Sequence, residues 1–163
     1  MTFFDKYMNR FLFTTISLLI ILLSFQTVYS DTIGHIRARS GSTSYNTFIW
    51  NGKFVKLQSG ATCETTWIFD GKKLKNQCGA ISYNTYLWNG KQFRPMSGAT
   101  GRNTWIWNGT ELKRQVGSTS GNTWCFDGHY WSLQQGSTSD NSWVISGFVP
   151  IPVCILIILG LNR

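Results

Sequence analysis

Aromatic side chains recur along the middle of the chain at a fixed interval of 19 residues. One series consists of Phe48, Trp67, Tyr86, Trp105, Trp124 and Trp143. Two glycine series have the same period, one from Gly41 to Gly136 and the other from Gly52 to Gly147. Series that share one period without an insertion indicate a tandem repeat of one supersecondary unit. Six repeat units therefore occupy residues 40–143, and the sixth is incomplete.

Each of the five complete units contains an Asn-Gly or Asp-Gly pair between two short runs of strand-forming residues. This arrangement predicts a β-hairpin with a two-residue turn, because Asn, Asp and Gly tolerate the positive φ that such turns need. In that register Trp107 lies opposite Thr110, and Trp105 lies opposite Leu112. Because side chains alternate between the two faces of a strand, we expect the mid-strand aromatic series and its apolar partners to form the core.

The expected fold class is all-β, with ten to twelve short strands in tandem 19-residue hairpins. One unit is too small to bury its own aromatic side chains, so neighbouring units must stack. A hairpin solenoid or meander is the preferred assembly, and a barrel or a propeller-like arrangement is the alternative.

Two short resemblances agree with this architecture. The run Trp50 to Ala61, WNGKFVKLQSGA, resembles the repeats of choline-binding modules on bacterial surfaces, which are hairpin solenoids with aromatic cages between units. That family has adjacent aromatic residues just after the turn glycine, and this chain has them only at Tyr130-Trp131. Choline binding is therefore not carried over. The T-W-x-W-N-G element also resembles one hairpin of a Kelch-type blade.

Both ends of the chain are apolar. Residues 1–30 have the pattern of a secretory signal peptide, with basic Lys6 and Arg10 before an apolar run from Phe11 to Phe25. Residues 31–39 form a lead-in to the repeats. We expect residues 144–163 to be a hydrophobic anchor signal for a lipid, or else a short membrane segment.

The cysteines and one asparagine carry further predictions. Cys63 and Cys78 lie near the two ends of one hairpin, so a disulfide between them is expected in a secreted chain. Cys125 stands where other units have Ile or Leu, which indicates a small apolar side chain. The sequence Asn108-Gly109-Thr110 is an acceptor for N-glycosylation at a hairpin tip.

Composition argues against an enzyme. The chain has two His and seven acidic residues, and only 13% of its residues are charged. Asp127 and His129 lie close together, but Asp127 is a turn residue, and no Ser-His-Asp or paired-carboxylate pattern accompanies them. No Cys-x-x-Cys pair or His cluster predicts a metal site. We therefore expect no catalysis, no cofactor and no metal.

Repeated aromatic side chains favour a binding module instead. Aromatic rings stack on sugars or cations, and nearby amides supply hydrogen bonds. The predicted ligand-facing residues are the turn-side tryptophans and the asparagines that begin the strands, namely Trp50, Trp88, Trp107, Asn46, Asn84, Asn103 and Asn122.

Basic residues follow the turns. The formal charge of the chain is +8, and a predicted basic surface comprises Lys53, Lys56, Lys72, Lys75, Lys91, Arg94 and Lys113. This surface could hold a sulfated glycan or an anionic membrane. Equally, such lysines protect short strands from aggregation. The signal peptide argues against nucleic acid as a partner.

Together these patterns predict a secreted β-repeat protein on the extracellular face of the plasma membrane, tethered through its C-terminus by a lipid anchor or a short span. Its expected role is non-catalytic binding of carbohydrate or another cell-surface ligand in adhesion. Polyanion binding and a purely structural coat are the alternatives.

Overall fold

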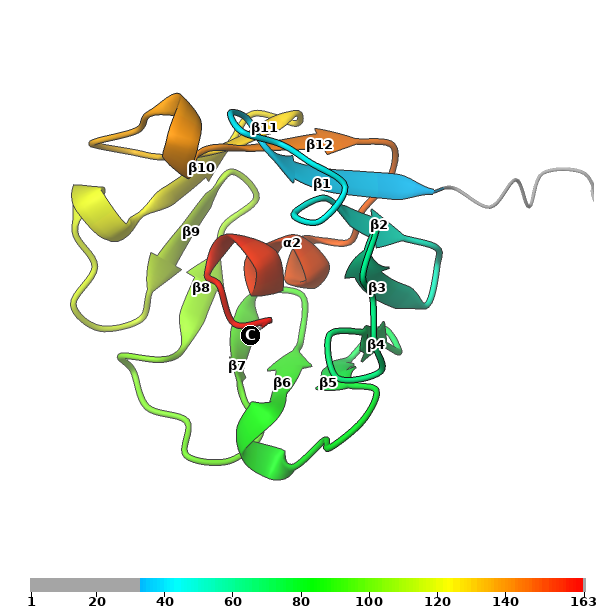
Figure 1. Cartoon of the computed structure of the whole chain (residues 1–163). Helices are drawn as coiled ribbons and strands as arrows, with labels where there is room; N and C mark the ends of the chain where they lie inside the picture. The colour runs from blue at the N-terminus through cyan, green and yellow to red at the C-terminus, as the bar shows by residue number, and fades with distance from the viewer. Residues whose placement is uncertain (1–32, 163) are drawn as a thin grey trace, which may run out of the picture. The chain divides into compact units, whose positions relative to one another are not determined.

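The computed structural model describes residues 33–162, in which twelve antiparallel strands form a closed barrel (Figure 1). The strands follow one another around the barrel in chain order, and β1 closes it by pairing with β12. They are β1 (Gly34–Ala38), β2 (Phe48–Trp50), β3 (Phe54–Leu57), β4 (Trp67–Phe69), β5 (Lys73–Asn76), β6 (Thr85–Trp88), β7 (Gln92–Pro95), β8 (Trp105–Trp107), β9 (Glu111–Arg114), β10 (Trp124–Phe126), β11 (Tyr130–Leu133) and β12 (Trp143–Ser146). The all-β hairpin repeat is confirmed. The barrel alternative fits, because the strands follow one another as a meander that closes on itself and do not form a solenoid.

The predicted hairpin register is wrong by two residues, as the pair β8–β9 illustrates. Trp107 lies opposite Leu112 and Trp105 opposite Arg114. Asn108 does not adopt a positive φ, whereas Gly109 does, at 108°. The Asn108 side-chain oxygen accepts hydrogen bonds from the backbone nitrogens of Thr110 and Glu111. The turn therefore centres on Gly109 and Thr110. A shift of two residues keeps every side chain on its predicted face.

The lead-in segment is the missing second strand of the sixth unit. β1 pairs along its length with β12, so that Ile36 lies opposite Ile145. At the end of this pair the two backbones approach closely: a Cβ placed on Gly34 would lie 2.2 Å from the carbonyl oxygen of Phe148. Glycine is therefore required there by space. The first and last strands thus close the barrel as a sixth hairpin without a turn.

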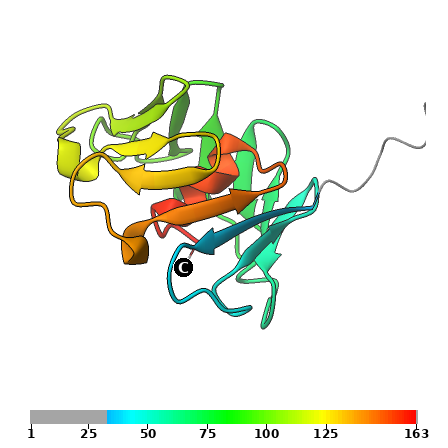
Figure 2. The same cartoon turned by 90° about the horizontal axis from the view of Figure 1, so that it is seen from above.

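A short helix fills the barrel. The helix α2 (Ile151–Ile158) lies inside the ring of strands, as both views show (Figures 1 and 2). Val153, Ile155 and Leu156 have no exposed surface, and the inward-facing aromatic side chains of the strands pack in the same cluster. Pro150 and Pro152 stand where a helix begins, a position at which proline is tolerated.

The structure places the C-terminal segment differently from the sequence prediction. Residues 144–146 belong to β12, and the apolar run that was expected to be an anchor signal or membrane segment forms the centre of the core. The physical reason is the width of the barrel, since more than about eight strands leave a lumen that their own side chains do not fill. In the described part of the chain, no helix has the length and apolar character needed to cross a bilayer. The predicted signal peptide, residues 1–30, lies outside the described residues.

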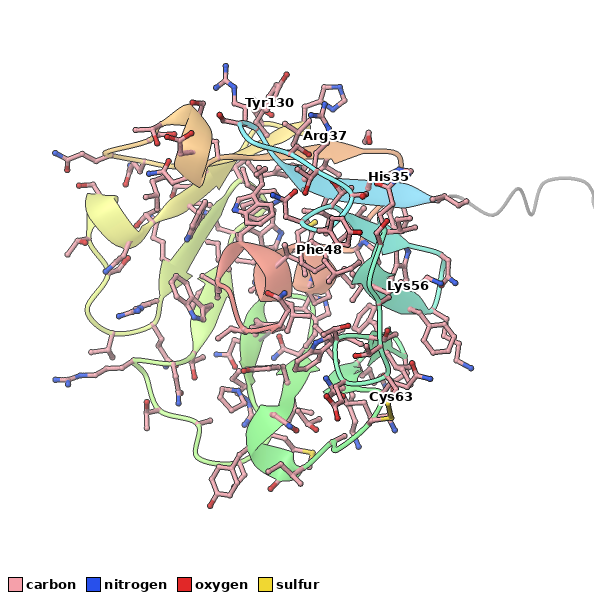
Figure 3. All side chains as sticks on the ribbon, viewed as in Figure 1. His35, Arg37, Phe48, Lys56, Cys63 and Tyr130 are labelled. Atoms are coloured by element: carbon pink, nitrogen blue, oxygen red, sulfur yellow. A yellow bond between two sulfur atoms is a disulfide. The ribbon has the colours of Figure 1, made fainter. Side chains whose placement is uncertain are left out.

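Most of the core residues predicted from the repeat are confirmed, and Tyr86 and Trp143 of the same series are only partly buried. Phe48, Trp67, Trp105 and Trp124 are buried, as are their apolar neighbours on the second strands, Val55, Leu74, Phe93, Leu112 and Trp131. In Figure 3, Phe48 points toward the barrel interior and Lys56 away from it.

Candidate functional site

The Asp127–His129 pair is a turn, as its sequence indicated. The Asp127 carboxylate accepts hydrogen bonds from the backbone nitrogens of Tyr130 and His129, at 2.7 and 2.8 Å. These bonds lower the pKa of Asp127. Within residues 33–162, no group of three or more His, Cys, Asp or Glu side chains is arranged to hold a metal ion.

The predicted turn-side tryptophans lie at the end of the barrel where α2 begins. Trp50 belongs to the core and does not line the hollow that contains Trp88 and Trp107, whose side chains are half-buried. With Phe69 and Phe126 they line a hollow of about 610 Å³, which we call the turn-side pocket. Its other walls are turn glycines and the apolar start of the helix. Apart from the indole nitrogens, no lining side chain has a polar atom, so only these nitrogens and backbone groups could orient a sugar there.

The predicted asparagines shape the links between units. In each of their four links the asparagine side-chain oxygen accepts a hydrogen bond from a backbone nitrogen three residues earlier, and its side-chain nitrogen donates to a glycine carbonyl five residues earlier. These asparagines are Asn46, Asn84, Asn103 and Asn122. Three links contain a single 3₁₀ turn, η1 (Ser82–Asn84), η2 (Ser120–Asn122) and η3 (Ser139–Asn141). Both polar atoms of each asparagine amide are therefore already hydrogen-bonded to the backbone, and a ligand would have to share these atoms with their backbone partners.

A second hollow lies at the opposite end of the barrel, where α2 ends and the links cluster. Its volume is about 560 Å³, and we call it the link-side pocket. It combines aromatic side chains with polar ones and an apolar floor from the end of the chain, and its principal lining residues are Tyr86, Trp105, Trp124, Arg102, Arg114, Asn103, Asn122 and Leu159. Tyr86 is half-buried, whereas Trp105 and Trp124 belong to the core and expose only 7% and 9% of their surface. Burial raises the pKa of Tyr86, so its phenol stays protonated and can donate a hydrogen bond.

Arginine at position 114 departs from the repeat. The equivalent inward-facing residues of the other units are Ala38, Leu57, Asn76, Pro95 and Leu133. The Arg114 guanidinium lies over the Trp105 ring, 5.2 Å from its centroid. The Arg114 residue is solvent-exposed at the end of its strand, so the cation–π contact positions its guanidinium without burying the charge.

A comparable hollow between the first and second units provides an internal comparison. It is lined by Tyr45, Asn46, Phe48 and Leu57, which occupy the same repeat positions as Arg102, Asn103, Trp105 and Arg114. The same backbone thus frames an uncharged hollow in one place and a doubly basic one in another.

The predicted basic residues lie on the outer surface of the barrel or beside its turns. Arg37, Lys56, Lys75, Arg94 and Lys113 occupy one repeat position on successive second strands, and we call them the outer basic row. Two interstrand spacings separate neighbouring members across the sheet, about 10 Å. Lys53, Lys72 and Lys91 are exposed at the turns. Among residues 33–162 one ion pair forms, in which the Lys113 ammonium lies 2.7 Å from the Glu111 carboxylate.

The disulfide between Cys63 and Cys78 is confirmed, and it joins two successive links. Cys125 has a free thiol on the outer face and is partly buried. Asn108 is exposed at a hairpin tip, as expected of an acceptor for a glycan.

No family model, curated protein or solved structure matches this chain. The site must therefore be argued from its own geometry. Sequence reasoning included Asn103 and Asn122 among the ligand-facing residues. It assigned Tyr86, Trp105 and Trp124 to the core and did not single out Arg102 and Arg114 as ligand-facing. The available signal was the departure from the repeat at Arg102 and Arg114.

Proposed function

We propose that this protein is a non-catalytic carbohydrate-binding module whose binding site is the link-side pocket. The observation that carries the proposal is the combination of Tyr86, Trp105 and Trp124 with hydrogen-bonding side chains in one hollow of about 560 Å³. A hollow of this size lies in the range of small-ligand sites.

The chemistry of the pocket suits a sugar ring. The C–H faces of a pyranose pack on aromatic side chains, and its hydroxyl groups need donors and acceptors within reach. The phenol of Tyr86 and the guanidinium groups of Arg102 and Arg114 supply donors, while Leu159 keeps the floor apolar. The turn-side pocket offers the aromatic part of this chemistry without the polar part.

The proposed place of action is the cell exterior. The Cys63–Cys78 disulfide favours an oxidising compartment, in agreement with the signal peptide expected at residues 1–30.

A glycan array with tryptophan fluorescence as a second readout tests the proposal. Trp105→Phe introduces the residue that the first unit has at Phe48, so the barrel should still fold. We expect it to weaken sugar binding roughly three- to tenfold, because the larger indole face is lost. Trp143→Phe is the matched control, since Trp143 occupies the same repeat position in the sixth unit and lies outside the link-side pocket. Absence of any saccharide ligand would refute the proposal and leave a structural role.

The outer basic row supports a second candidate, the binding of a sulfated polymer or an anionic membrane. Four of its five members lack a carboxylate partner within the described residues. Contacts of this kind weaken steeply as salt screens them. Binding that disappears between 0.05 and about 0.5 M salt, and that is unaffected by Trp105→Phe, would favour this candidate.

A further inference from the structure

The link-side pocket contains two arginines at positions where the rest of the repeat does not place a cation. Arg102 replaces residues that are Tyr45, Glu64, Tyr83, Gly121 and Asp140 in the other links. Arg114 occupies a site that is Leu in two units and uncharged in the other three. A repeat that otherwise conserves its geometry has therefore gathered two positive charges at one hollow.

Neither arginine is neutralised by the described part of the protein. No Asp or Glu lines the link-side pocket, and the ion pair found within residues 33–162 joins Lys113 to Glu111 on the outer face. Stacking over Trp105 orients the planar group of Arg114 without satisfying its five N–H donors. The pocket thus presents oriented donors of positive charge beside aromatic walls.

Resting on the proposed carbohydrate function, we infer that the ligand of this pocket is an acidic sugar whose carboxylate is held by Arg102 and Arg114. A guanidinium matches a carboxylate with two parallel N–H···O bonds, and such charge-assisted pairs are stronger than neutral hydrogen bonds. The pyranose ring that carries the carboxylate then faces Tyr86 and Trp124. The uncharged hollow at Tyr45 and Leu57 lacks this selectivity.

Two matched pairs of probes test the inference by calorimetry on the full chain. They are trigalacturonic acid with its methyl ester, and 3′-sialyllactose with lactose. We expect the acidic member of at least one pair to bind roughly tenfold or more tightly than its neutral partner. Arg102→Tyr combined with Arg114→Leu rebuilds the sequence of the uncharged hollow, and in this variant the preference should disappear.

The control variant also removes two positive charges, but from the outer face of the barrel. Lys75→Gln with Arg94→Gln lies on the outer basic row and should keep the preference for the acidic sugar. Equal affinity for acidic and neutral partners, or a preference that survives in the pocket variant and is lost in the control, overturns this inference alone. Absence of binding to all four probes, together with an array that shows no ligand, overturns the proposed function as well.

Discussion

The acidic residues of two turns, Asp70 and Asp127, act as hydrogen-bond acceptors for their own backbone. The Asp70 side chain accepts from the backbone nitrogens of Lys73 and Lys72, at 2.7 and 2.9 Å, as the Asn108 side chain does for its turn. These bonds lower the pKa of Asp70 and of Asp127. A lowered pKa in the folded state stabilises the protein above the unfolded pKa, and this stabilisation is lost as the pH falls through the folded value.

Asp70→Asn with Asp127→Asn separates the charge from the geometry of the turn. Asn holds the same turns elsewhere in the repeat, so the variant should fold normally at pH 7. Between pH 7 and pH 3 the melting temperature of the wild type should fall further than that of the variant, by about 2 °C for such exposed groups. Thermal melts followed by circular dichroism across this range provide the check. Parallel melting curves for both proteins would show that the ionised carboxylates add nothing.

Helix α2 is the element whose role the sequence predicted least well. Leu156 has no exposed surface and lies in the cluster that joins the helix to the strands. Apolar character alone does not distinguish a lipid environment from a wide barrel lumen, because both are apolar surroundings. The sequence pattern contains no information on barrel width, which depends on closure by β1.

Leu156→Ala tests whether the helix supports the barrel. Removal of a fully buried leucine side chain should lower the free energy of unfolding by about 2–5 kcal/mol. Phe148→Ala is the control, because this side chain is 63% exposed and its loss should change stability by no more than about 0.5 kcal/mol. Chemical denaturation of both variants measures the difference. An unchanged free energy for Leu156→Ala would mean that the helix is not part of the core.

The links between units are joined by the same backbone contact, and one of them has a covalent addition. The Cys78 nitrogen donates to the Cys63 carbonyl, just as Ser59 donates to Ser44 and Ser97 to Ser82. Serine therefore fits both cysteine positions. The disulfide adds a cross-link to a contact that the fold already makes.

Cys63→Ser with Cys78→Ser should fold into the same barrel and be less stable by about 3 kcal/mol, the loss expected for a loop of this length. Reduction of the wild type should produce the same decrease in the free energy of unfolding. A decrease below about 0.5 kcal/mol would show that the hydrogen-bonded links are sufficient.

At the scale of the whole molecule, repetition explains what the sequence could predict. The 19-residue period identified the hairpins, the faces of the strands and the inward-facing series from Phe48 to Trp124, because these are local properties of one unit. Closure depends instead on Gly34–Ala38 meeting Trp143–Ser146, which are separated by the whole repeat. The register was wrong because Gly109, rather than Asn108, adopts the positive φ.

The candidate site also combines features that repeat in every unit with features that only the assembled barrel shows. Aromatic and amide positions repeat, so the sequence predicted them as a class without distinguishing the two ends of the barrel. The structure separates an apolar hollow around Trp88 and Trp107 from a polar one around Trp105 and Arg114. Function is expected where units differ, since identical units can only build identical hollows.

The most direct test of the binding site is a titration of the eight tryptophan indole signals in a ¹H–¹⁵N spectrum with an oligosaccharide that the array has identified. We expect the signals of Trp105 and Trp124 to shift with ligand while those of Trp88 and Trp107 remain in place. Shifts confined to Trp88 and Trp107 would contradict this expectation and move the binding site to the opposite end of the barrel.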